Sequence, residues 1–203
     1  MSMLMLVTRT PRRLPPMGRG LRRWIKNPAV RAVVRRLFNP PRIQSGPLLP
    51  TLGPESLKAA GVRGQDVIRA VRRLADHDMV GPDVAMLLIS EVSMAAAFAR
   101  RQNDPVIRRI DERREAMRNG PHILDDDSFR IDDGFDYARA FDREEKRRMR
   151  AIRMEVLRDA GESALARMIE EHPDHYRERV LIGARQFNAA ARARSTPRRT
   201  AAA

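Results

Sequence analysis

The sequence predicts an all-α protein: a small irregular domain of five or so helices, preceded by a long basic N-terminal arm. Three observations predict it. Apolar residues recur at intervals of three and four from about residue 65 onward, while the strict alternation typical of strands is not sustained anywhere. Six Phe, two Tyr and one Trp leave a core to be built from aliphatic residues, Ala and eleven Met, which suits helices. Basic residues gather at the N-terminus.

The charge of the chain is unevenly distributed. The first 54 residues hold ten Arg and one Lys and no acidic residue, so they supply 11 of the +14 net charge. The remaining residues carry 29 basic and 26 acidic side chains, which is close to balance. Such an asymmetry is typical of a basic arm or an organelle-targeting segment, and it indicates an anionic partner or a transport signal.

The arm itself has internal organisation. In segment 20–38 the apolar residues fall at helical spacing with basic residues on the other faces, and Asn27-Pro28 predicts a cap and a first-turn proline that restart the helix. Five Pro and two Gly make 39–54 a linker. The predicted organisation is therefore 1–54 as arm or mitochondrial presequence plus linker, 55–194 as helical domain, and 195–203 as disordered tail.

The domain reads as a succession of helices separated by Gly and Pro. The stretch from Val84 to Ala99 is apolar nearly all round, which predicts a central buried helix. Helical pairs at i,i+4 are expected between Asp142 and Lys146 and between Glu144 and Arg148. The predicted helices cover 65–76, 83–102, a segment from Asp104-Pro105 to Gly120-Pro121 with Met117 in its apolar stripe, 137–159, 163–171 and 174–192.

Catalytic, metal and cofactor sites are not predicted. The chain has no Cys, no nucleophile elbow and no Gly-rich phosphate loop. The acidic run 125–136 lacks the turn glycine and the terminal Glu of a calcium loop, because Arg130 and Asp136 occupy those positions. His172 and His175 have no Cys and no second His pair elsewhere in the sequence to complete a zinc site. The protein is expected to be non-enzymatic, with no cofactor and no metal.

No apolar run approaches the roughly 18–20 residues of a membrane span, so an integral membrane protein is not expected. The amphipathic segment 20–38 is compatible with three functions: a mitochondrial presequence, a helix lying on a membrane surface, or an RNA-binding arm.

Together these features favour a non-enzymatic structural subunit of a large mitochondrial assembly on the matrix side. The first choice is a mitochondrial ribosomal protein, an RNA-binding component of a ribonucleoprotein, whose arm contacts the RNA phosphate backbone. The expected nucleic-acid-binding residues are Arg9, Arg12, Arg13, Arg19, Arg22, Arg23, Lys26, Arg31, Arg35, Arg36 and Arg42.

Two other classes remain open. One is a helical accessory subunit of a respiratory or ATP-synthase complex, in which the arm would be a cleaved transit peptide and the nearly neutral body would contact other subunits. The other is a phage or bacterial capsid or nucleoid protein whose arm neutralises packaged nucleic acid. Arginine doublets in the body, such as Arg72-Arg73 and Arg147-Arg148, fit either solvated helix faces or additional phosphate contacts.

Overall fold

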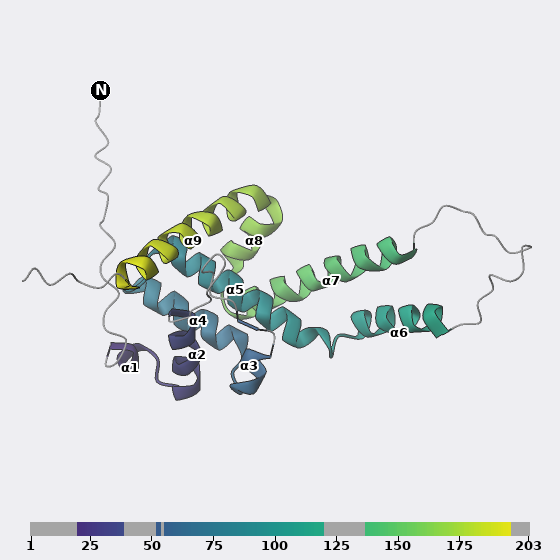
Figure 1. Ribbon diagram of the computed structural model, residues 1–203, viewed down its shortest axis with the longest axis horizontal. Coiled ribbons are helices and arrows are strands. Elements are labelled where there is room, and N and C mark those ends of the chain that lie inside the picture. Colours follow the sequence, from purple (N-terminus) through teal and green to yellow (C-terminus); the bar gives the residue numbers. More distant parts are fainter. Residues whose placement is uncertain (1–19, 39–51, 54, 120–136, 196–203) are drawn as a thin grey trace, which may run out of the picture.

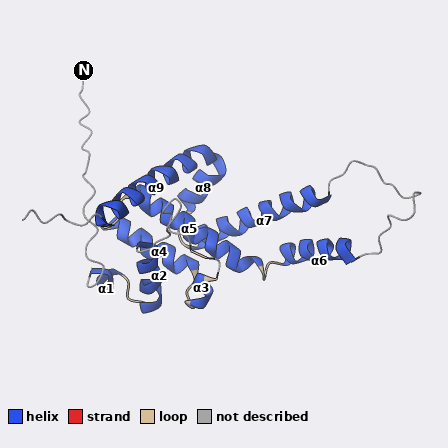
Figure 2. Ribbon diagram, in the orientation of Figure 1, coloured by secondary structure: helices blue, strands red, loops and turns tan. Residues whose placement is uncertain are grey.

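A computed structural model describes residues 20–38, 52–53, 55–119 and 137–195. All regular structure in these residues is helical, which confirms the predicted all-α class (Figure 1, Figure 2). The nine described helices are α1 (Gly20–Trp24), α2 (Pro28–Phe38), α3 (Ser56–Ala59), α4 (Gly64–Asp76), α5 (Pro82–Arg101), α6 (Pro105–Asn119), α7 (Tyr137–Asp159), α8 (Ser163–Glu171) and α9 (Pro173–Ser195).

The centre of the fold is α5, as the sequence predicts. Pro82 begins the helix, where its missing N–H costs no hydrogen bond, and α4, α7 and α9 pack around it. Leu87, Leu88 and Val92 are fully buried. The burial is not complete, however, because Met94 and Phe98, one turn apart in its C-terminal half, stay 37% and 45% exposed.

Helices α1 and α2 pack onto α4 and belong to the same hydrophobic core. Asn27 caps α2 as predicted, since its Oδ1 accepts a hydrogen bond from the backbone N–H of Ala29 at 2.9 Å. Seven apolar side chains of this segment are at most 4% exposed: Leu21, Ile25, Val30, Val33, Val34, Leu37 and Phe38. The described part of the arm is therefore packed against the helical domain rather than extended away from it.

Helices α7, α8 and α9 return the chain to the centre. Gly161 turns the chain between α7 and α8 with φ +88°, a left-handed conformation that glycine adopts without strain. Helix α9 then crosses α5 at very close range. A Cβ on Gly183 would lie 2.1 Å from the backbone oxygen of Asp83, so only glycine fits there.

Helix α6 and the N-terminal half of α7 form a hairpin that projects from the other helices (Figure 1). Ile107 of α6 is buried in a small cluster with Ala97 and Ile152. The sequence prediction that Met117 belongs to the packed stripe is wrong, because this side chain is 59% exposed. The apolar face of α6 is therefore buried near Ile107, where the helix meets the other helices, and exposed near Met117, further along the hairpin.

By length and composition alone, α5 could also cross a membrane, in contrast to the sequence-based estimate that no run is long enough. It is the one helix of this kind in the described residues, with a mean hydropathy of 1.4 over an 18-residue window. A core helix has the same properties, and 56% of this window is buried inside the protein.

Several sequence predictions fall on residues outside the described ranges. These are most of the linker 39–54, the acidic run 125–136 and the tail from residue 196 onward. Within the described ranges, the short α3 was not predicted, and α9 continues to Ser195, beyond the predicted end at 192.

Candidate functional site

The basic residues of α1, α2 and the turn between them form the candidate site, which we call the α1–α2 cationic face. It consists of six of the predicted nucleic-acid-binding residues: Arg22, Arg23, Lys26, Arg31, Arg35 and Arg36. The other five predicted residues lie outside the described ranges: Arg9, Arg12, Arg13, Arg19 and Arg42.

The amphipathic pattern of the segment fixes how these side chains lie. The apolar residues of α1 and α2 face α4, so the basic residues that alternate with them are left on the outside. All six are exposed except Arg31, which is half-buried and donates a hydrogen bond from Nη1 to the backbone oxygen of Ile25 at 3.2 Å. This hydrogen bond joins α2 to Ile25, the residue that directly follows α1.

The cationic face has no counter-charge of its own. None of its six side chains forms an ion pair with a carboxylate in the described part of the chain, although fourteen such ion pairs occur elsewhere in it. Helices α1 and α2 also contain no acidic residue. Apart from Arg31, whose Nη1 is bonded to the backbone oxygen of Ile25, these guanidinium and ammonium groups are therefore available to an external anion.

An aromatic pair lies beside these cations. The indole of Trp24 stacks on the imidazole of His77, with ring centroids 3.6 Å apart and an angle of 28° between the planes. The guanidinium carbon of Arg23 lies 5.0 Å from the centre of the Trp24 ring, within the range of a cation–π contact. Phe38, the other aromatic residue of these two helices, is 1% exposed and cannot contact a ligand base.

His77 was missed as a member of this site. It follows α4 directly, and its backbone N–H donates to the carbonyl of Arg73 at the helix end. Nothing in the local sequence distinguishes it from an ordinary solvent-exposed residue at a helix terminus. Only the packing of α1 on α4 brings it to Trp24.

Arginines in the body of the protein are used differently. Arg72 donates from Nε and Nη2 to the carboxylate of Glu162 at 2.7 and 2.5 Å, and this ion pair joins α4 to the start of α8. Arg148 donates to Oδ2 of Asp104 at 2.9 and 2.7 Å, joining α7 to the start of α6. In both doublets the neighbour, Arg73 or Arg147, is exposed.

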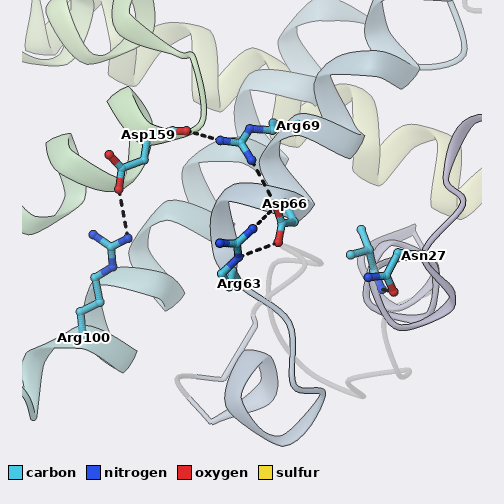
Figure 3. A network of polar contacts seen from close by, with 7 residues as sticks. Asn27, Arg63, Asp66, Arg69, Arg100 and Asp159 are labelled. Carbon is cyan, nitrogen blue, oxygen red and sulfur yellow. Dashed lines mark hydrogen bonds and ion pairs between the residues drawn. The ribbon is translucent and has the colours of Figure 1, made fainter.

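Figure 3 shows a network of the same kind on the surface of α4. Asp66 accepts hydrogen bonds from Arg63 and Arg69, and Arg69 also reaches the backbone oxygen of Asp159 at the end of α7. The side chain of Asp159 pairs in turn with Arg100 of α5 at 3.2 Å. Arg69 and Arg100 thus join helices through Asp159, while Arg63 pairs with Asp66 at the start of α4, so all three are already engaged with acceptors of the protein.

A cluster of hydroxyl groups lies at the junction of α5, α7 and α9. Arg153 donates to Oγ of Ser93 at 2.9 Å, to Oγ of Ser90 at 2.8 Å and to the hydroxyl of Tyr176 at 2.5 Å. The hydroxyls of Ser90 and Tyr176 also hydrogen-bond to each other. Burial raises the pKa of the neighbouring Glu91 carboxyl, and the charge of Arg153 opposes that shift. The contacts of the cluster link three helices.

Within the described ranges, no group of three or more His, Asp or Glu is arranged to hold a metal ion. His172 ends α8 and His175 lies in the first turn of α9, so the two do not share a continuous helix.

No protein family model, curated protein or solved structure matches this chain. The functional argument therefore rests on the chemistry and geometry of the α1–α2 cationic face.

Proposed function

We propose that this protein is a non-enzymatic structural subunit that binds the phosphate backbone of RNA through the α1–α2 cationic face. The observation that carries the proposal is the set of six cations, unpaired within the described chain, on two helices anchored in the core. Of the assemblies that the sequence favours, the mitochondrial ribosome, on the matrix side, is the one that offers such a partner. Other subunits of that assembly would be its protein partners.

The chemistry of the face supports a phosphate partner. Five of the six cations are arginines, whose planar guanidinium groups bind phosphate oxygens with two hydrogen bonds at once. Because the apolar side chains hold both helices in place, the cations lose less conformational freedom on binding than those of a free arm would.

The packing of the segment also bears on the presequence alternative. Cleavage after residue 38 would remove seven buried apolar side chains and expose the surface of α4 that they cover. Each buried side chain of this size contributes about 1.5–3 kcal/mol to folding. This supports retention of residues 20–38 in the mature protein.

The test compares two variants of the full-length chain with equal net charge. The first carries Arg22→Gln, Lys26→Gln, Arg35→Gln and Arg36→Gln in the cationic face. The control carries Arg108→Gln, Arg109→Gln, Arg113→Gln and Arg147→Gln, four equally exposed residues of α6 and α7 without ion pairs in the described chain. Affinity for a single-stranded RNA of about 20 nucleotides is measured from about 50 to 200 mM salt.

We expect the first variant to bind more weakly and to lose about 0.7 of the log–log salt slope for each cation that contacts a phosphate. The control should keep most of the wild-type slope. Equal losses in the two variants would show that only net charge matters and would contradict the proposal. A parallel titration with duplex DNA addresses the capsid or nucleoid alternative, which requires binding to DNA at least as tight as to RNA.

One observation favours the second candidate function, an accessory subunit that contacts other proteins. The exposed Met94 and Phe98 form a small apolar surface on α5. Replacing both with Ser should leave the isolated protein folded. Under this alternative the double variant would no longer co-sediment with its native complex, whereas the variant in the cationic face still would.

A further inference from the structure

We infer that the Trp24–His77 pair is a stacking site for an unpaired nucleobase, which makes the α1–α2 cationic face a surface for single-stranded RNA rather than for duplexes. The inference rests on the proposed function and adds the class of RNA that the face selects. Bases within a duplex are already stacked on each other and cannot reach a protein ring without unpairing.

The two rings differ in how they are held. Trp24 is half-buried and packs against the core, so its indole has a fixed position. His77 lies on the solvent side of the pair and is exposed. A base that stacks on the outer face of the imidazole would extend an existing stack of two rings to three. The protein has already ordered the first two rings, so the ligand base alone must be immobilised.

The charges around the pair separate a place for the base from a place for the phosphates. Asp76 directly precedes His77 at the C-terminal end of α4, where the helix dipole is also negative. A phosphate is disfavoured there, whereas a flat uncharged base is not. Arg22, Arg23 and Lys26 lie on the α1 side of the pair, and Arg23 contacts the Trp24 ring itself.

This arrangement matches the requirements for sequence-tolerant binding of single strands. Such sites combine cations that follow the backbone with aromatic rings on which bases stack. Because every base has a flat ring face, a stacking site should show little preference among sequences of equal stacking strength.

The test uses the full-length protein and three probes: an oligouridine of about 12 nucleotides, the same backbone with abasic sites, and an RNA duplex. His77→Ala removes the outer ring of the stack, and His77→Phe keeps a flat ring. His77 is exposed, and its hydrogen bonds at the end of α4 are made by its backbone N–H, so both variants should fold.

We expect His77→Ala to weaken oligouridine binding at least about fivefold, the lower end of the effect of removing one stacked base, and His77→Phe to stay within about twofold of wild type. Binding to the abasic strand and to the duplex should be unchanged in both variants. In the NMR spectrum of the wild type, the imidazole resonance that His77→Phe lacks should shift upfield on adding oligouridine, because of the ring current of the stacked base.

Two results would overturn the inference separately from the proposed function. If His77→Ala binds oligouridine like wild type while the four-cation variant does not, RNA binding stands and the stacking site is wrong. If His77→Ala weakens all three probes equally, the residue acts on the fold or the charge of the face and not on a base. If the wild type binds none of the probes, the proposed function and the inference both fail.

Discussion

The N-terminal helices and the body of this protein use the same residue type in opposite ways. In α1 and α2 the arginines form no ion pair with a carboxylate of the described residues, and these helices contain no acidic residue. In α4 to α9 many arginines pair with carboxylates, some within one helix and some of other helices, as Arg72 does with Glu162 and Arg148 does with Asp104. The difference lies in the surrounding acids and not in the arginines.

The comparison teaches that a count of basic residues is a poor guide to a binding surface. The body has 29 of the 40 basic residues, yet much of its charge is balanced by its own acids. Arg114 alone lies within ion-pair distance of Asp111, Asp142 and Glu145. The α1–α2 cationic face differs because α1 and α2 contain no carboxylates, and this can be seen directly in the sequence.

The largest expected effect concerns the anchor of α2. Val34 is fully buried and Ala32 is exposed on the same helix. Val34→Asp buries an unpaired charge and should lower the free energy of unfolding by about 4 kcal/mol, whereas Ala32→Asp should change it by less than about 0.5 kcal/mol. Denaturant unfolding of both variants measures the difference. If Val34→Asp unfolds like wild type, α2 is a detachable arm and the packing described above is wrong.

The next effect concerns the ion pair that ties α6 to α7. Oδ1 of Asp104 caps α6 by accepting from the backbone N–H groups of Val106 and Ile107, while Oδ2 pairs with Arg148. Asp104→Ala removes both interactions and leaves Arg148 without this partner, at a cost of about 2–4 kcal/mol. Asp104→Asn keeps the cap and should recover about 1 kcal/mol of that loss. Thermal unfolding of the two variants separates the contribution of the cap from that of the ion pair. Identical losses of stability in Asp104→Ala and Asp104→Asn would show that the cap contributes nothing.

A pH dependence follows from the same residue. The hydrogen bonds from Arg148 lower the pKa of the Asp104 carboxyl below its ordinary value of 3.8, so the group stabilises the folded state above that value. This stabilisation is lost as the pH falls through the lowered pKa. The difference in unfolding free energy between wild type and Asp104→Asn should be constant near neutral pH and shrink below about pH 4. A difference that grows in acid would contradict this assignment.

The smallest effect distinguishes the two classes of arginine by stability alone. Arg35→Gln with Arg36→Gln removes exposed charges that lack ion pairs and should change stability by less than about 0.5 kcal/mol. Arg72→Gln leaves the carboxylate of Glu162, which is 7% exposed, without its guanidinium partner and should cost about 1–3 kcal/mol. Calorimetric unfolding of the two variants checks the contrast. Similar losses in both would mean that the N-terminal arginines are also structural.

Local signals in the sequence predicted the helices well. The bounds of α7 and α8 agree with the prediction because Gly161 stops one helix and the apolar spacing defines the other. The helix predicted over 65–76 is confirmed as α4, and Val67 and Leu74 are among its buried residues. The outward direction of the α1–α2 cations follows from the same periodicity.

Contacts between distant segments could not be predicted in this way. The expected pair between Asp142 and Lys146 is replaced by one between Asp142 and Arg114, and Arg148 pairs with Asp104 instead of Glu144. Pairs at i,i+4 are worth only a few tenths of a kcal/mol, so an acid brought close by tertiary packing displaces them. The stacking of Trp24 on His77 has the same origin, since neither residue signals the other in the sequence.

The crowding of like charges on α1 and α2 has a consequence for how the protein responds to ionic strength. Six cations on two short helices and the turn between them repel one another, and the apolar anchor opposes that repulsion. Added salt screens the repulsion and so should tighten the docking of α1 and α2 in the free protein. Under the proposed function, the same salt weakens RNA binding, because each counterion released from the phosphates then gains less free energy. Higher ionic strength should therefore favour the docking of α1 and α2 in the free protein, whereas lower ionic strength should favour RNA binding. A bound polyanion would neutralise the same cations and so would stabilise the docking without added salt.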